Sequence, residues 1–108
     1  MSAERLQQLR ALLAEEPGDP FLRYAIALEL KRNGDILQAT SDLEALLLER
    51  PDHVPSYYQL AVLLAEQDRR NEAIAACDAG TLQCIVAGDR KARSELLALK
   101  EALEDGDA

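Results

Sequence analysis

The side chains best suited to nucleophilic, acid–base or zinc chemistry are one histidine, His53, and two cysteines, Cys77 and Cys84. A catalytic histidine needs a partner that orients it toward a nucleophile, and a structural zinc ion usually takes four ligands. His53 lies alone in a proline-flanked segment that reads as a loop, where a solvated or capping role is expected. No glycine-rich phosphate loop is present. The sequence therefore predicts no enzyme, no cofactor and no metal site.

Composition and charge narrow the functions further. The 108 residues carry 12 Lys+Arg against 20 Asp+Glu, a net charge of −8. Binding to nucleic acids and to anionic membranes depends on cationic surfaces, so this balance argues against both. No apolar run approaches the roughly 20 residues of a membrane span, and the first residues lack the layout of a secretion signal. The sequence predicts a cytoplasmic protein whose partners are basic or apolar.

The elements that position these residues follow from a repeat of 34 residues. Shifting the chain by this period places prolines on prolines and apolar residues on apolar residues. The aligned pairs include Pro17 with Pro51, Tyr24 with Tyr58, Leu30 with Leu64, Ala39 with Ala73, and Leu43 with Cys77. Such a period is typical of repeats that are helix pairs and bury a continuous core by stacking.

Start and stop signals divide the chain into six helices. Asp19 suits an N-cap with Pro20 in the first turn, and Gly34 and Gly88 suit left-handed helix ends. Ile85 occupies the position of a third proline, so the fifth helix is expected to continue past it. No segment reads as a strand. The expected helices span 3–15, 20–33, 36–49, 55–67, 71–87 and 90–104.

The repeat resembles the tetratricopeptide repeat family over residues 1–87. The family motif has an apolar–small pair in its first helix, a small residue opening its second helix and a closing proline. These features are met by Ile26-Ala27, Leu60-Ala61, Ala39, Ala73, Pro17 and Pro51. Departures from the motif include Asp68 at the usual turn glycine and Gly80 at a usual alanine.

The resemblance implies an all-α fold, a short right-handed α-solenoid of about six helices in antiparallel pairs. The expected divisions are a half repeat over 1–18, repeats over 19–53 and 54–88, and a C-terminal capping helix with an acidic tail over 89–108, all within one domain.

The resemblance also implies a function. Members of the family hold a peptide or helix of a partner protein in a concave groove lined by the first helix of each repeat. Here the groove residues would be Phe21, Tyr24, Leu28, Lys31, Arg32, Tyr58, Val62, Ala65 and Glu66. These positions also lie off the core stripes of their helices, where an apolar residue calls for a neighbour or a partner. We therefore expect a non-enzymatic protein–protein interaction module with tyrosine anchors.

Two further readings bear on this function. Some members clamp the terminal carboxylate of heat-shock chaperones with Lys, Asn and Arg, but Tyr24, Leu28 and Gln59 occupy the corresponding positions here. The clamp is therefore not expected. The alternative function is a self-assembling, homodimeric structural module that buries the groove or the long fifth helix. The leucines of the half repeat, Leu6, Leu9, Leu12 and Leu13, favour such self-assembly.

The two cysteines are expected to differ. Cys77 aligns with Leu43 of the core and is predicted to be buried and inert. Cys84 is predicted to lie nearer solvent, where oxidation or intermolecular pairing is easier. Seven residues along a helix separate them by about 10.5 Å along its axis, beyond the roughly 7 Å that a disulfide allows between Cα atoms. An internal bridge is therefore not expected, in agreement with a reducing compartment.

Overall fold

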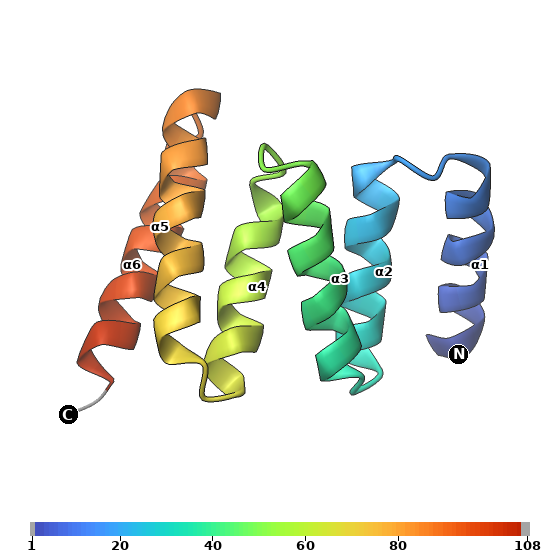
Figure 1. Cartoon of the computed structure of the whole chain (residues 1–108), viewed down its shortest axis with the longest axis horizontal. Helices are drawn as coiled ribbons and strands as arrows, with labels where there is room; N and C mark the ends of the chain where they lie inside the picture. Colours follow the sequence, from blue (N-terminus) through green and yellow to red (C-terminus); the bar gives the residue numbers. More distant parts are fainter. Residues whose placement is uncertain (1, 107–108) are drawn as a thin grey trace. The chain divides into compact units, whose positions relative to one another are not determined.

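The computed structural model describes residues 2–106, and six α-helices make up most of this range (Figure 1). The helices are α1 Ser2–Glu15, α2 Pro20–Arg32, α3 Ile36–Glu49, α4 Pro55–Glu66, α5 Arg70–Ala87 and α6 Arg90–Asp105. No strand occurs within residues 2–106. The expected all-α class is confirmed, and every expected helix bound lies within one residue of the observed one.

The helices form two compact units, Met1–Arg50 with α1 to α3 and Pro51–Ala108 with α4 to α6. In the first unit, α2 packs against both α1 and α3. In the second unit, α5 packs against both α4 and α6, and α4 also contacts α6. Each unit therefore has one helix that packs against both of the others, α2 in the first unit and α5 in the second.

Specific residues set the helix ends as expected. The side-chain Oδ1 of Asp19 accepts hydrogen bonds from the backbone N–H groups of Phe21 (2.8 Å) and Leu22 (3.2 Å) at the start of α2. The carboxylate of Asp89 caps α6 in a similar way. Gly34 follows α2 and Gly88 follows α5, with φ of 86° and 72°. Because left-handed backbone is nearly free of strain only for glycine, these two residues end their helices sharply.

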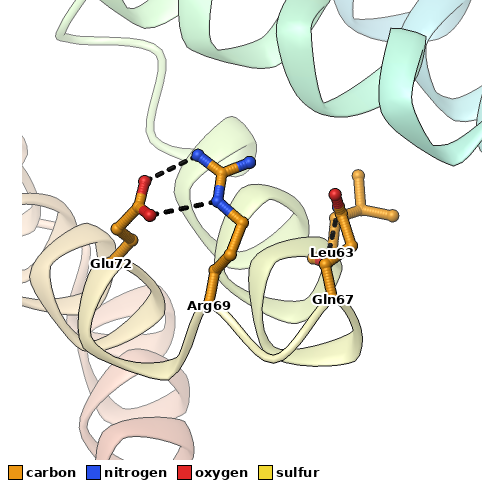
Figure 2. Close-up of polar contacts among 4 residues, drawn as sticks. All are labelled: Leu63, Gln67, Arg69 and Glu72. Carbon is orange, nitrogen blue, oxygen red and sulfur yellow. Dashed lines mark hydrogen bonds and ion pairs between the residues drawn. The ribbon is translucent and has the colours of Figure 1, made fainter.

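The turn between α4 and α5 uses a different residue. Asp68 occupies the position equivalent to Gly34, one repeat later, and has a φ of 60°. Figure 2 shows the side chains around this turn. The Arg69 guanidinium donates to both carboxylate oxygens of Glu72, with N···O distances of 3.1 and 2.6 Å, and Gln67 Nε2 donates to the Leu63 carbonyl at 2.9 Å. The hydrogen bond from Arg69 also lowers the pKa of Glu72.

The first unit combines an apolar core with a buried carboxylate. Ile26 and Leu30 of α2 are buried, and so is Leu43 of α3. Glu29, only 3% exposed, lies on the same side of α2. Its Oε1 lies 3.2 Å from Arg5 Nε of α1, so the carboxylate ties α1 to α2. A buried carboxylate without such a partner would destabilise the fold strongly.

The second unit packs around a stripe of small residues on α5. Ala73, Cys77, Gly80 and Cys84 recur every three or four residues and are all buried. Two hydrogen bonds join the first residue of α5 to the last turn of α6. Arg70 Nε donates to the Leu103 carbonyl at 2.6 Å, and Arg70 Nη2 donates to the Glu104 carbonyl at 2.9 Å.

The expectation for Cys84 is wrong, and of the two roles expected for His53 the solvated one is excluded. Cys84 is 1% exposed rather than near solvent, because its spacing from Cys77 places both thiols on the packed side of α5. His53 is 7% exposed rather than solvated, and its Nδ1 lies 2.7 Å from the hydroxyl of Ser56, which is fully buried. The buried imidazole helps to fix the start of α4, where the Ser56 N–H donates to the His53 carbonyl at 3.1 Å.

Candidate functional site

The candidate residues of the first unit share one face of α2. Phe21, Tyr24, Leu28 and Lys31 follow each other at spacings of three and four residues, and Arg32 lies four residues after Leu28. Phe21 is 72% exposed and Arg32 is exposed, whereas the other three are half-buried. The core residues of α2 take the opposite side of the helix, so this face is available for a partner.

The candidate residues of the second unit share one face of α4. Tyr58 is 40% exposed, Val62 and Ala65 are half-buried, and Glu66 is exposed. Val62 lies four residues after Tyr58, and Ala65 and Glu66 lie three and four residues after Val62, so all four share one side of the helix. The flanking positions of α4 are buried, so the accessible face is a narrow one.

The positive charges of the α2 face, on Lys31 and Arg32, lie at the C-terminal end of the helix. Arg32 Nη1 lies 3.6 Å from the Oε1 atom of Glu29, which also pairs with Arg5. Arg32 therefore lies toward the α1 side of the face. Sequence reasoning missed Glu29, although a signal existed. It lies three residues after Ile26 and directly before Leu30, within the buried stripe, where a charged residue requires an ion-pair partner.

A shallow depression adjoins Phe21. It has a volume of about 560 Å³, and its other lining residues include Pro17, Pro20 and Arg50. Apolar ring surfaces beside a guanidinium suit an apolar or aromatic side chain of a partner. Sequence reasoning did not connect Arg50 with Phe21, since they are far apart in the chain.

The structure thus places the candidate residues on two helix faces, one in each unit, and buries none of them. Their combination in one groove stays a prediction. Within residues 2–106, no cluster of three or more His, Cys, Asp or Glu side chains is arranged to hold a metal ion. In the same range, no helix combines the length and apolar character needed to cross a membrane.

This arrangement of helices recurs in proteins of known structure. No protein-family model matches the sequence, and no curated protein matches it. Several solved structures do. A tetratricopeptide repeat domain protein from Salinibacter ruber is 34% identical, with 81% of this chain and 98% of that chain covered and a TM-score of 0.78.

Two more distant structures share the fold. A protein from Bordetella parapertussis is 24% identical, with 95% of this chain and 90% of that chain covered and a TM-score of 0.81. The TPR2B domain of yeast Sti1, in its complex with pHsp70, is 14% identical. The match covers 97% of this chain and 84% of that chain, with a TM-score of 0.88. At these identities the similarity concerns the fold alone.

The similarity to the Salinibacter ruber protein extends to the sequence, because 34% of the residues are identical over a match that covers 98% of that chain. The helix pairs of this chain and its 34-residue repeat are typical of such a domain. The protein belongs to the tetratricopeptide repeat family.

Proposed function

We propose that the protein is a non-enzymatic interaction module that binds a peptide or helix of a partner protein through the exposed faces of α2 and α4. The observation that carries this proposal is the exposure of an aromatic side chain on each face, 72% for Phe21 and 40% for Tyr58. Burying a side chain such as phenylalanine contributes roughly 1.5–3 kcal/mol. Both rings are therefore suited to serve as binding anchors.

The chemistry of the two faces favours an apolar partner segment. Tyr24 and Leu28 occupy positions where chaperone-binding members carry Lys and Asn, and Gln59 replaces a further Asn. The TPR2B domain of Sti1 forms a complex with pHsp70, but the residue types here do not suit a terminal carboxylate. We propose that apolar side chains of the partner contact Tyr24, Leu28 and Tyr58, and that Lys31 and Arg32 orient it.

We also propose that the chain works as a single capped domain in the cytoplasm. Residues 19–53 and 54–88 act as two repeats, residues 1–18 and 89–108 act as caps, and together they work as one domain. The protein functions in the cytoplasm, where cysteines stay reduced. The two unbridged cysteines, both buried, agree with that compartment.

A pull-down from cell lysate tests the proposed faces. The wild type is compared with a Tyr24→Ala/Tyr58→Ala variant and with a control variant, Leu37→Ala/Leu48→Ala, which changes two exposed leucines of α3 (74% and 86% exposed). Circular dichroism and thermal unfolding establish that all three are folded. A protein that is captured by the wild type and the control, but not by the tyrosine variant, supports the proposal. Identical captured sets contradict it.

One observation favours the alternative, a homodimer. Leu12 of α1 is 50% exposed, whereas Leu9 of the same helix is buried. Sedimentation equilibrium distinguishes the two functions. A mass that stays dimeric at low micromolar protein, and becomes monomeric in a Tyr24→Asp or Tyr58→Asp variant, would replace the proposed function by self-assembly.

A further inference from the structure

The register of α4 against α5 carries the end of α5 beyond α4, where its packed side, with Cys84 1% exposed, stays buried but its outer side is uncovered. Gly80 of α5 lies against Tyr57 in the first turn of α4. Helix α4 begins at Pro55 and has 12 residues, whereas α5 has 18. Since the two helices run antiparallel, the α5 residues after about position 82 have no α4 residue opposite them. Figure 1 shows this end of α5, drawn in orange, extending past the N-terminal end of α4.

The uncovered end of α5 carries three large apolar side chains. Leu82 is 65% exposed, Ile85 is 57% exposed and Val86 is 84% exposed. Their spacing of three and four residues places them on one face of the helix. Ile85 occupies the repeat position that holds Pro17 and Pro51 earlier in the chain. Because a proline is missing there, the helix continues and this apolar face exists.

Cations follow this apolar face closely along the chain. The turn at Gly88 leads into the first residues of α6, where Arg90, Lys91 and Arg93 are all exposed. Within residues 2–106, none of these three side chains forms an ion pair. The only carboxylate between positions 79 and 94 is Asp89, whereas the whole chain has a net charge of −8. The α5–α6 tip is thus a cationic spot on an acidic protein.

We infer that the α5–α6 tip, defined by Leu82, Ile85, Val86, Arg90, Lys91 and Arg93, binds an acidic amphipathic segment of a partner protein. Apolar side chains of the segment pack on α5, and its carboxylates pair with the cations of α6. Charge complementarity selects this partner, since an acidic segment gains attraction only where cations gather.

A peptide fits this tip better than a membrane surface does. Charges more than about 8 Å away are largely screened at physiological salt, so a peptide that contacts only the tip interacts mainly with the local cations. An anionic bilayer is a plane and faces a wider part of the protein, including many of its 20 acidic residues. The binding surface differs from the α2 and α4 faces of the proposed function.

A defined probe tests the inference on the full chain. The probe is a fluorescent helical peptide of about 18 residues, built from leucine, alanine and glutamate with leucines at helical spacing. Its twin carries lysine in place of every glutamate. Fluorescence anisotropy gives the dissociation constants for the wild type, Ile85→Ser/Val86→Ser and Arg90→Glu/Lys91→Glu. Controls are the charge-conserving Arg90→Lys/Lys91→Arg and, on α3, Leu37→Ser/Leu48→Ser, all checked for folding by circular dichroism.

The expected result is binding of the glutamate peptide by the wild type and both controls. Each test variant should bind it about tenfold more weakly, equivalent to roughly 1.4 kcal/mol. The lysine twin should bind the wild type at least that much more weakly, and added salt should weaken the wild-type complex.

Several results would overturn the inference. Equal affinity of the wild type and both test variants would place the peptide elsewhere, and loss of binding in Tyr58→Ala alone would place it on the α4 face. Binding to phosphatidylserine vesicles without binding to the glutamate peptide would identify a membrane surface. A dimer abolished by Ile85→Ser/Val86→Ser would identify a second copy of the chain as the occupant.

Discussion

A β-carbon added to Gly80 of α5 would lie 2.7 Å from the β-carbon of Tyr57 and 2.8 Å from Leu96 Cδ1. Helices α4, α5 and α6 therefore meet at a point where one hydrogen atom is the largest side chain that fits. The Tyr57 hydroxyl, which donates to the Pro51 carbonyl at 2.6 Å, holds the ring in place. Gly80, at a position where the family usually has alanine, is thus a requirement of this packing.

Gly80→Ala should destabilise the protein despite improving helix propensity. Alanine is favoured over glycine in a helix by about 1 kcal/mol, but forcing a methyl group into a filled core costs typically about 1–3 kcal/mol. Because the added β-carbon would come within 2.8 Å of three side-chain atoms, the packing cost should lie at the upper end of that range, and we expect a net loss of about 1–2 kcal/mol in the free energy of unfolding by urea. Gly18→Ala is the control, because a β-carbon there meets nothing within 4 Å. Equal stability of Gly80→Ala and the wild type would contradict the tight packing.

Asp68→Gly should stabilise the protein. Asp68 has a φ of 60° in the turn where the first repeat uses Gly34. Glycine relieves the left-handed strain but makes the unfolded chain more flexible, so the net gain is expected to be about 0.5 kcal/mol. The reciprocal variant Gly34→Asp should be less stable than the wild type. A loss of stability in Asp68→Gly, measured by thermal unfolding, would show that the aspartate side chain stabilises the turn.

Two adjacent arginines should differ in importance. Arg70→Ala removes two hydrogen bonds to carbonyls at the end of α6, and charged donors of this kind contribute about 1.5–3 kcal/mol each when buried. Because these bonds are partly exposed, we expect a loss of about 1–2 kcal/mol in total and faster hydrogen exchange in the last turn of α6. Arg69→Ala breaks the exposed pair with Glu72 shown in Figure 2 but removes no hydrogen bond to the end of α6, so it should leave hydrogen exchange in the last turn of α6 nearly unchanged.

Stability should fall at alkaline pH because the buried thiols resist ionisation. Burial raises the pKa of Cys77 from 9.0 to about 11, and it also raises that of Cys84. The unfolded chain releases these protons above about pH 9, whereas the folded chain retains them, so the stabilising effect present at lower pH is lost as the pH rises toward 11. Burial raises the pKa of Tyr57 as well, which extends the loss to higher pH.

Urea unfolding of the wild type and a Cys77→Ala/Cys84→Ala variant measures this effect. The variant starts from a lower stability, because two sulfur atoms leave the core, but its stability should decline less between about pH 9 and pH 11. Parallel pH profiles for the two proteins would contradict the assignment to the thiols. At neutral pH the wild-type thiols should react with iodoacetamide far more slowly than in the unfolded chain.

The helices were predictable because their ends depend on local chemistry. Pro20 and Pro55 fix first turns, and Gly34 and Gly88 supply left-handed ends that few other residues tolerate. These signals act within a few residues, so a single sequence reveals them. The 34-residue repeat also predicted which helices pair, because equivalent positions of the two repeats should bury equivalent side chains.

Burial of individual polar and sulfur side chains was harder to predict, because it depends on a second helix. Cys84 is buried only because α5 packs on that side. His53 lies in a proline-flanked loop, yet the hydroxyl of Ser56 lets its ring leave solvent. Glu29 needs Arg5 of another helix. Periodicity indicates which side of a helix is inward, but it does not say how far a neighbouring helix reaches.

The candidate site could be predicted only in part. Exposure of Phe21 and Tyr58 agrees with the expected faces of α2 and α4, whereas the partner itself leaves no imprint on a single sequence. The α5–α6 tip was missed although Ile85 marked the longer helix, because exposure of its apolar residues depends on which side of α5 packs against α4 and α6.

Within each unit most helix contacts join sequence neighbours, and this has a kinetic consequence. The contacts that join α1 to α2, α2 to α3, α4 to α5 and α5 to α6 each close only a short stretch of chain. Small loops lose little entropy on closure, and proteins dominated by such local contacts fold in microseconds to milliseconds. Nascent hairpins of this chain can therefore assemble as soon as a pair of helices is complete, which leaves their apolar faces little time to aggregate.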